Sequence, residues 1–223
     1  MPEPGDPANF VRANTAITAA PLVPEIKLHL ASEITPLWHA TEASLARAQL
    51  PPPYWAFAWA GGQALARHIL DHPTLVRGHS VLDFGAGSGL VAIAAAMSGA
   101  RVTAAEIDPF AAAAIVLNAS LNGVAVAIER ADVIGREPAP WEIVLAGDMC
   151  YERPLAERLT HWLRALAARG VTVLLGDPGR AYLPGGGLEA VGRYDVPTTL
   201  ELEDRLSREG VVWRLTGTAL SAS

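Results

Sequence analysis

The sequence is poor in cysteine and in charge. Its 223 residues include a single cysteine, Cys150, so the chain cannot form a disulfide within itself or a cysteine-based metal site. A lone cysteine is typical of a reducing compartment. Charged residues make up 18% of the chain and hydrophobic residues 51%, which indicates a compact globular protein and excludes a disordered chain.

Basic clusters and long apolar runs are also missing. The net charge is −6 and no block of lysine and arginine occurs, which argues against a surface for nucleic-acid phosphates. No apolar run reaches the length that spans a bilayer. Met1 to Phe10 contain prolines and acids, without the apolar segment of a signal peptide or the arginines of a transit peptide. We therefore expect a cytoplasmic monomer with no nucleic-acid or membrane partner.

The length suits one α/β domain with an N-terminal extension. Residues 1–50 are expected to form the extension, which faces the substrate, and residues 51–223 the domain. Within the extension, alternating apolar and polar residues predict a strand over 25–30. A helix is expected over 33–48, because apolar residues recur there at helical spacing and Pro51 stops the pattern.

Strands and helices alternate from residue 80 onward, as in a doubly wound parallel sheet. We predict a seven-stranded Rossmann-like α/β sheet, mostly parallel with antiparallel last strands, and helices on both faces. The polar stretch 199–209 is expected to be helical. The predicted strands are 80–84, 101–105, 124–130, 142–146, 171–175, 188–194 and 211–215, and the predicted helices are 89–98, 109–121 and 154–168.

A glycine-rich turn, Gly85-Ala86-Gly87-Ser88-Gly89, follows the first of these strands. Its glycines are closer together than in the G-x-G-x-x-G turns that bind a dinucleotide pyrophosphate. Such a turn presents bare backbone N–H groups and a helix N-terminus to a ligand. Asp83 precedes it by two residues, where a carboxylate repels a pyrophosphate but holds the ammonium group of an amino acid. S-adenosylmethionine carries such a group, so the turn favours this cofactor.

Acids at the next two strand ends extend the expected cofactor site. Glu106, beside Ile107, is placed to accept both hydroxyls of a ribose. Asp132 is a candidate acceptor for the adenine amino group, with Val133 beside it as an apolar contact, although a solvated turn aspartate is the alternative. Glycine-rich turns and acids at strand ends are each common in loops that bind no ligand, so neither motif alone identifies a cofactor site. In this order and context they together favour an S-adenosylmethionine site.

A dense aromatic run, Tyr54-Trp55-Ala56-Phe57-Ala58-Trp59, precedes Gly61-Gly62 and a helix expected to reach about Leu70. Trp59 is the candidate for packing near the adenosine or closing its pocket, and the alternative is a core aromatic residue.

The chemistry is expected at Asp148 and Tyr151, because ligands of open α/β sheets bind outside the carboxyl ends of the strands. Asp148 would hold a substrate amine and Tyr151 would form a wall of the pocket. An N-cap for the helix that begins near Pro154 is the alternative role of Asp148.

Five stretches resemble the seven-β-strand S-adenosylmethionine-dependent lysine methyltransferases, and most closely the electron transfer flavoprotein β-subunit group. The resemblance implies a Rossmann-like methyltransferase fold, transfer of a methyl group to lysine of that subunit, and a lysine pocket shaped by Asp148 and Tyr151. Mitochondrial members carry a targeting peptide that is missing here, so a bacterial-type relative is expected. The stretches are Pro53–Leu65, Val81–Gly89, Glu106–Pro109, Gly147–Tyr151 and Gly176–Arg180.

Other functions remain open from the sequence. They are a methyltransferase for another protein, such as a ribosomal-protein type, or for a small amine, a nicotinamide-dependent oxidoreductase, and a silent cofactor-binding module. The stretch Asp177-Pro178-Gly179-Arg180 is interpreted either as a partner contact or as an ordinary turn. The histidines lack metal-ligand spacing, so no metal is expected.

Overall fold

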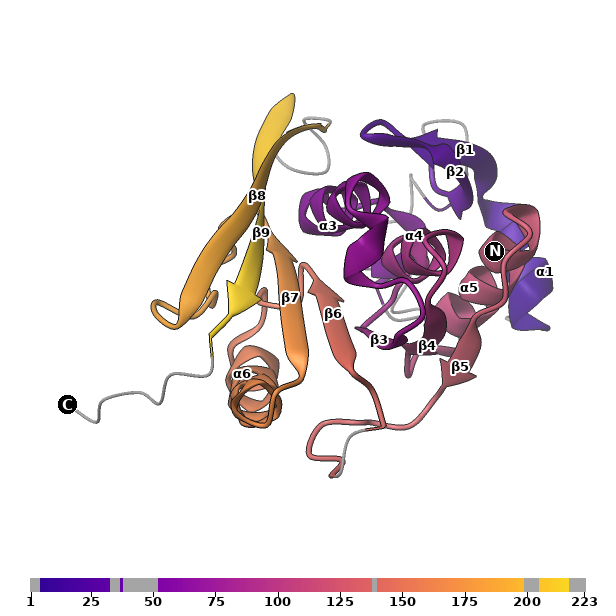
Figure 1. Ribbon diagram of the computed structural model, residues 1–223. Helices are drawn as coiled ribbons and strands as arrows, with labels where there is room; N and C mark the ends of the chain where they lie inside the picture. Colours follow the sequence, from indigo (N-terminus) through magenta and orange to yellow (C-terminus); the bar gives the residue numbers. More distant parts are fainter. Residues whose placement is uncertain (1–4, 33–36, 38–51, 138–139, 199–204, 217–223) are drawn as a thin grey trace.

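A seven-stranded mixed sheet forms the centre of the protein (Figure 1). The computed structural model describes residues 5–32, 37, 52–137, 140–198 and 205–216. The strand order is β5-β4-β3-β6-β7-β9-β8. Strands β5, β4, β3, β6 and β7 run parallel, and β9 runs antiparallel to its neighbours β7 and β8. This arrangement confirms the predicted fold class. The strands are β3 (Ser80–Phe84), β4 (Arg101–Ala105), β5 (Ala127–Glu129), β6 (Ile143–Gly147), β7 (Thr172–Asp177), β8 (Leu188–Pro197) and β9 (Ser207–Leu215).

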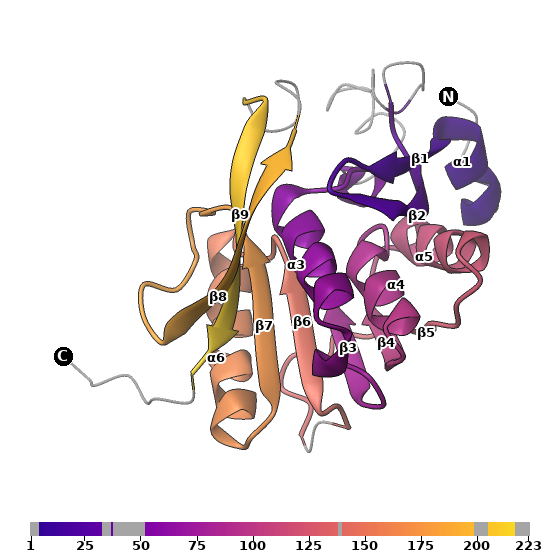
Figure 2. The ribbon, with the colours of Figure 1, turned by 45° about the horizontal axis from the view of Figure 1, so that its top comes forward.

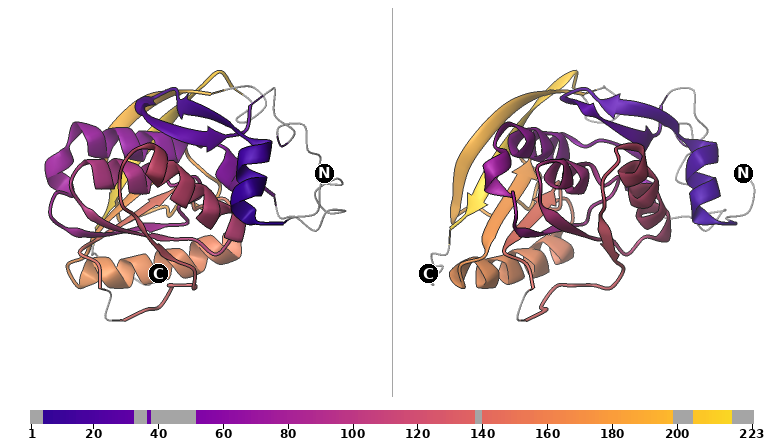
Figure 3. Two further views of the ribbon diagram at one scale, coloured as in Figure 1. Left: turned by 90° about the vertical axis from the view of Figure 1, so that its right-hand side faces the viewer. Right: turned by 45° about the vertical axis from the view of Figure 1, so that its right-hand side comes forward.

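Helices cover both faces of the sheet (Figure 3). On one face lie α3 (Ala60–Asp71), α4 (Leu90–Met97) and α5 (Pro109–Leu121), and on the other lies α6 (Arg153–Ala168). Every residue from Leu90 to Ala95 is buried, because α3, the sheet and the N-terminal strand β2 surround α4. That enclosure explains why an entirely apolar helix occurs here.

The N-terminal segment packs on the helices of this face (Figure 2). It consists of α1 (Pro7–Asn14) and a hairpin of β1 (Ala16–Ala20) and β2 (Val23–Leu30). The Asn122 side chain, at the end of α5, accepts a hydrogen bond from Lys27 N at 2.9 Å and donates one to Lys27 O at 2.7 Å. The Asn122 side chain therefore makes the two hydrogen bonds that a neighbouring strand would otherwise make with Lys27 at the edge of β2.

The structure confirms the strand predicted over 25–30 and extends it to Val23. Neither α1 nor β1 was predicted. The helix predicted over 33–48 lies outside the described residues, apart from Leu37, which is buried.

Two predictions near other strands are corrected. The stretch 199–209 is not helical where it is described, because Ser207–Glu209 begin β9 and pair with residues 195–197 of β8. Pairing with β8 satisfies the backbone N–H and C=O groups of these residues, although their polar sequence had suggested a helix. The strand predicted over 124–130 contains only Ala127–Glu129.

Four glycines allow α3 to cross the carboxyl ends of β6 and β7 at backbone contact. A Cβ added to Gly147 would lie 2.9 Å from the Cα of Gly62, and one added to Gly61 would collide with the carbonyl oxygen of Gly176. The glycine pair after the aromatic run is therefore a packing requirement. It places the N-terminus of α3 beside the residue that follows β6, Asp148.

Candidate active site

The glycine turn joins β3 to α4 at the point where the strand order of the sheet reverses. Gly85, Gly87 and Gly89 have φ angles of +64°, +52° and +80°, which residues with a side chain rarely adopt. Gly85 and Ala86 donate their backbone N–H groups to the end of β4, and Gly87 donates to the Glu106 carboxylate. The turn is thus fixed against the neighbouring strand end.

Glu106 lies after β4, between the glycine turn and α5. Its Oε2 accepts from Gly87 N and its Oε1 from Asp108 N, both at 3.0 Å. Burial raises the pKa of this carboxyl, and the backbone donors act against that rise. The neighbouring Ile107 is 70% exposed, which is unusual for so large an apolar side chain. The structure therefore brings three predicted features together: the turn, the acid and an apolar surface.

Asp83 is buried at the end of β3, with 2% of its surface exposed. Its Oδ2 accepts a hydrogen bond of 2.9 Å from Ala92 N in the first turn of α4. Burial raises the pKa of Asp83 to about 8, and the charge of Glu106 adds to the rise. The carboxyl is therefore mostly protonated at pH 7, and a bound cation would favour its ionised form.

Asp132 and Val133 follow β5 and are held by protein contacts. Asp132 accepts from Arg158 Nη2 at 2.8 Å and from Ile134 N at 2.9 Å. The Arg158 hydrogen bond holds the pKa of Asp132 below its usual value. Val133 is buried in the core that underlies α6. Contact of either residue with adenine stays a prediction, and Asp132 would have to use lone pairs beyond these two bonds.

Trp59 stands directly before α3, within an aromatic cluster. Its Nε1 donates to the Tyr54 carbonyl at 2.8 Å, and its ring meets those of Tyr54 and Phe57 at centroid distances of 6.2 and 5.8 Å. The guanidinium carbon of Arg180 lies 5.5 Å from the Trp59 ring centroid. Trp59 is therefore half-buried beside a charged group, and its contact with adenosine stays a prediction.

Asp148 follows β6 and joins two distant segments. Its φ is +57°, the one positive φ of a non-glycine residue in the described ranges. Its Oδ2 accepts from Gly62 N at 2.7 Å, and its Oδ1 accepts from Arg180 Nη2 at 2.8 Å and Nε at 3.2 Å. Since Trp59 has no capping oxygen, Asp148 satisfies an N–H group in the first turn of α3.

The alternative role of Asp148, as the cap of the following helix, is wrong. That helix, α6, begins at Arg153 and has Glu152 at its N-cap position. Asp148 instead caps α3 from outside that helix.

The pKa values of the titratable groups in the loop after β6 reflect burial. Burial raises the pKa of Asp148 to about 6, although Arg180 and the Gly62 N–H act to lower it. Burial also raises the pKa of the Cys150 thiol to about 12, so this thiol is not a nucleophile at neutral pH. Tyr151 is 44% exposed, its ring centroid lies 5.6 Å from that of Tyr54, and burial raises the pKa of its phenol. Tyr151 thus lies partly exposed beside Tyr54 and is a neutral phenol at neutral pH.

Arg180 belongs to this site and was not predicted from the sequence. The turn that carries it is ordered by Asp177, whose Oδ1 accepts from Gly179 N at 2.7 Å and Arg180 N at 2.6 Å. The stretch Gly176–Arg180 was a signal that the turn matters. No pattern in the sequence shows that Arg180 reaches Asp148.

The described residues also bear on metal binding and on membrane helices. No group of three or more His, Cys, Asp or Glu side chains is placed there to hold a metal ion. The helices of the same ranges are all too short or too polar to cross a membrane.

Known proteins are similar to this chain over most of its length. The family model for ribosomal protein L11 methyltransferase (PrmA) matches residues 64–174. The electron transfer flavoprotein beta subunit lysine methyltransferase of Xenopus laevis is 39% identical over 217 residues, which cover 93% of this chain and 86% of the relative. The human protein of the same name is 43% identical over 187 residues, 81% of this chain and 69% of the relative.

A solved methyltransferase structure has a similar fold. The magnesium protoporphyrin IX methyltransferase of Synechocystis PCC 6803 superposes with a TM-score of 0.53 at 16% identity, over 70% of this chain and 80% of that one. At this identity the likeness concerns the fold alone. The sequence relationship extends over most of both chains, and this chain therefore belongs to the electron transfer flavoprotein β-subunit lysine methyltransferase family.

Proposed function

We propose that this methyltransferase transfers methyl groups from S-adenosylmethionine to lysine side chains of the electron transfer flavoprotein β subunit. The observation that carries the proposal is the cation site formed by Asp148 and Trp59, where a buried carboxylate and an aromatic face receive a guanidinium. Asp148 keeps an acceptor position beside this guanidinium, and that position suits an N–H of a lysine amino group. The names of the relatives support the choice of substrate.

The residues at the ends of β3 and β4 fit the cofactor. Bound S-adenosylmethionine supplies an electrophilic methyl group on a sulfonium. We expect Asp83 to hold the ammonium group, and the N-terminus of α4 to face the carboxylate. Glu106 accepts the ribose hydroxyls in this arrangement, and Ile107 offers its exposed surface to the ring. The positive φ angles of the glycine turn favour glycine, so Gly85, Gly87 and Gly89 place no side chain of their own between the backbone and the cofactor.

The substrate amine must lose a proton before it can act as a nucleophile. A free lysine has a pKa near 10.4, so its neutral form at pH 7.4 costs about 4 kcal/mol. Desolvation beside Tyr54 and Tyr151 lowers that cost, whereas an unpaired carboxylate at Asp148 would increase it. We therefore assign Asp148 to capture and orientation of the amine, and Tyr151 to the shape of the pocket.

A Glu106→Ala enzyme is expected to bind S-adenosylhomocysteine about 10- to 100-fold more weakly, because the ribose hydroxyls lose a charged acceptor. Isothermal titration calorimetry measures this change. Glu106→Gln, which keeps one acceptor oxygen for Gly87 N, should lose less, and Glu157→Ala on the exposed side of α6 is the control. Unchanged affinity in Glu106→Ala would place the ribose acceptor elsewhere.

Cofactor binding at pH 7 is expected to release close to one proton. The pKa of Asp83 is about 8 in the free protein, so the carboxyl is mostly protonated, and an ammonium group beside it lowers that pKa. Calorimetry of S-adenosylhomocysteine binding in buffers of different ionisation enthalpy counts the proton. Asp83→Asn should bind without this release. A wild-type enzyme that releases no proton would remove Asp83 from contact with the ammonium group.

The proposed function is tested by transfer of a radiolabelled methyl group into purified substrates. The electron transfer flavoprotein is compared with ribosomal protein L11, free lysine and small amines, because the L11 methyltransferase model also matches this chain. We expect label in the flavoprotein β subunit above all others. Preferential labelling of L11 would favour the ribosomal-protein alternative.

A further inference from the structure

The carboxylate assigned to lysine capture already holds a cation of the chain itself. Arg180 Nη2 and Nε lie 2.8 and 3.2 Å from Asp148 Oδ1, and the two side chains are only 18% and 10% exposed. The guanidinium also lies over the ring of Trp59, 5.5 Å from its centroid. Arg180 thus contacts both the shielded carboxylate and the aromatic face, and a lysine amine would have to share Asp148 with it.

The turn that carries Arg180 is anchored on both sides. The Arg180 N–H donates to Asp177 at 2.6 Å, and the Arg180 carbonyl accepts from Leu183 N at 3.1 Å. Tyr182 N donates to the carbonyl of Cys150, two residues beyond Asp148, at 3.1 Å. Departure of the guanidinium would leave a buried carboxylate with its charge uncompensated, which is costly. These contacts favour an Arg180 that stays in place when substrate binds.

The paired carboxylate still has capacity for the substrate. An ionised carboxylate offers about four acceptor positions. Gly62 and Arg180 together use three hydrogen bonds at Asp148. One position therefore remains for an N–H of the incoming amine.

We propose that Arg180 is a positioning residue that stays paired with Asp148 during methyl transfer, so that the pair offers the substrate amine an acceptor without net charge. A lysine bound there does not receive the stabilisation that a lone carboxylate gives an ammonium ion, and it loses its proton to solvent more readily. The inference rests on the proposed lysine methylation and adds the residue that sets the charge of its pocket.

The charges around Asp148 come from a small set of groups. Asp177, at the end of β7, raises the pKa of Asp148, and Arg180 lowers it. The Cys150 thiol in the same loop is neutral because burial raises its pKa to about 12. The first turn of α3 contributes the Gly62 N–H and no charged side chain. Loss of Arg180 therefore removes the cation that keeps Asp148 ionised near neutral pH.

The test compares Arg180→Gln, Arg180→Lys and wild type by two readouts. The titration of the Asp148 carboxyl is followed by NMR in the free enzyme, and kcat for flavoprotein methylation is measured from pH 6 to 9. In Arg180→Gln we expect the carboxyl midpoint to rise by about 1 to 3 pH units. The acid limb of the kcat profile should move in the same direction, and kcat at pH 7 should fall about tenfold or more, with less change in KM.

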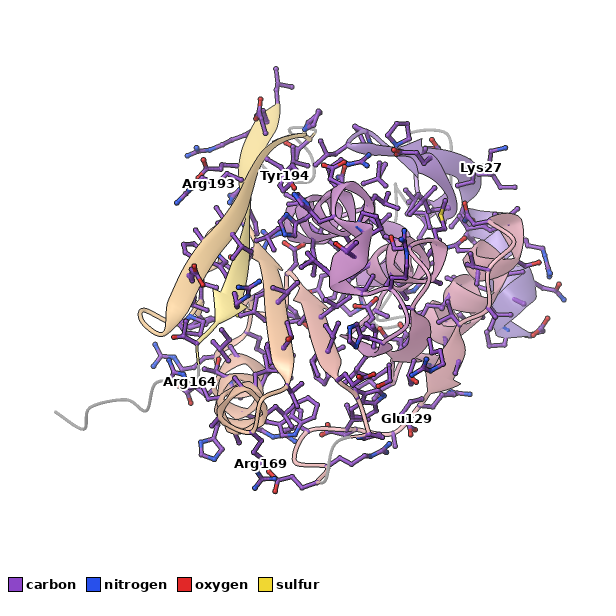
Figure 4. All side chains as sticks on the ribbon, viewed as in Figure 1. Lys27, Glu129, Arg164, Arg169, Arg193 and Tyr194 are labelled. Carbon is purple, nitrogen blue, oxygen red and sulfur yellow. The ribbon has the colours of Figure 1, made fainter. Side chains whose placement is uncertain are left out.

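Two further variants separate this role from a structural one. Arg180→Lys keeps the charge but not the planar fork, so it should restore the carboxyl midpoint and recover part of kcat. Arg169→Gln is the matched control, because Arg169 pairs with Glu137 at the end of α6 that is farther from the Asp148 loop (Figure 4). It should leave both readouts unchanged. S-adenosylhomocysteine affinity verifies that each variant is folded.

An unmoved Asp148 titration in Arg180→Gln overturns the inference, and so does a loss of kcat by the same factor at every pH. These outcomes differ from failure of the proposed function, in which the wild-type enzyme transfers no methyl group to the flavoprotein. In that event the free-enzyme titration still decides whether Arg180 sets the charge of Asp148, and an unmoved midpoint overturns the inference there as well.

Discussion

An Asp148→Asn enzyme is expected to lose methyl transfer to lysine by about 100-fold or more, since small misplacements at a reacting centre have effects of this size. The carboxylate accepts hydrogen bonds on both of its oxygens, from Gly62 N on one side and from Arg180 on the other. An amide replaces one of these acceptors by an NH₂ donor. Either the first turn of α3 or Arg180 must then lose its partner, and the amine loses its acceptor.

The same variant should bind S-adenosylhomocysteine with nearly wild-type affinity, because the glycine turn and Glu106 are held by other contacts. Steady-state methylation and calorimetry on one preparation measure both quantities. Asp195→Asn, on the exposed strand β8, is the control. Turnover by Asp148→Asn equal to that of wild type would remove Asp148 from the reaction.

A Gly176→Ala protein is expected to be destabilised by about 3 kcal/mol, or about 6 to 12 °C in Tm, and to lose most of its activity. The new Cβ would collide with the backbone carbonyl of Gly61 and lie 2.8 Å from the Leu65 Cβ. Neither backbone can move without shifting α3 relative to β7. Such a shift would also separate Gly62 from Asp148.

Thermal unfolding followed by circular dichroism measures the change in Tm. Gly185→Ala is the matched control, because a Cβ added there meets nothing within 4 Å and the residue does not need a positive φ. If Gly176→Ala were as stable and as active as Gly185→Ala, the close crossing of α3 over β7 would not be needed for the pocket.

Sequence patterns were sufficient for the elements whose partners lie close along the chain. The alternation of strands and helices predicted the parallel strands from β3 to β7 and the helices between them, because each apolar run signals one buried element. The glycine turn was visible because its glycines need unusual backbone angles. Glu106 was found from its distance to that turn along the chain.

Features that depend on distant contacts were not predictable in this way. Pairing with β8 makes the polar residues Ser207–Glu209 a strand. Asn118 of α5 and Asn122 at its C-cap accept hydrogen bonds from the backbone of β2. The Asp148–Arg180 pair joins residues 32 positions apart on different strand ends. Hydrophobic periodicity indicates which face of a helix or strand is buried, but it does not indicate which residues pack against that face. Arg180 reaches Asp148 because the ends of β6 and β7 lie side by side in the sheet, which the sequence alone does not show.

We propose that Asp148 and Arg180 direct a methyl group to a lysine of the flavoprotein β subunit. The most direct measurement is mass-spectrometric mapping of that subunit after incubation with S-adenosylmethionine and either the wild-type or the Asp148→Asn enzyme. We predict methyl groups on lysine Nε with the wild type and almost none with the variant. Methylation at another residue type, equal methylation by both enzymes, or an unmodified subunit beside an enzyme that methylates L11 would contradict the claim.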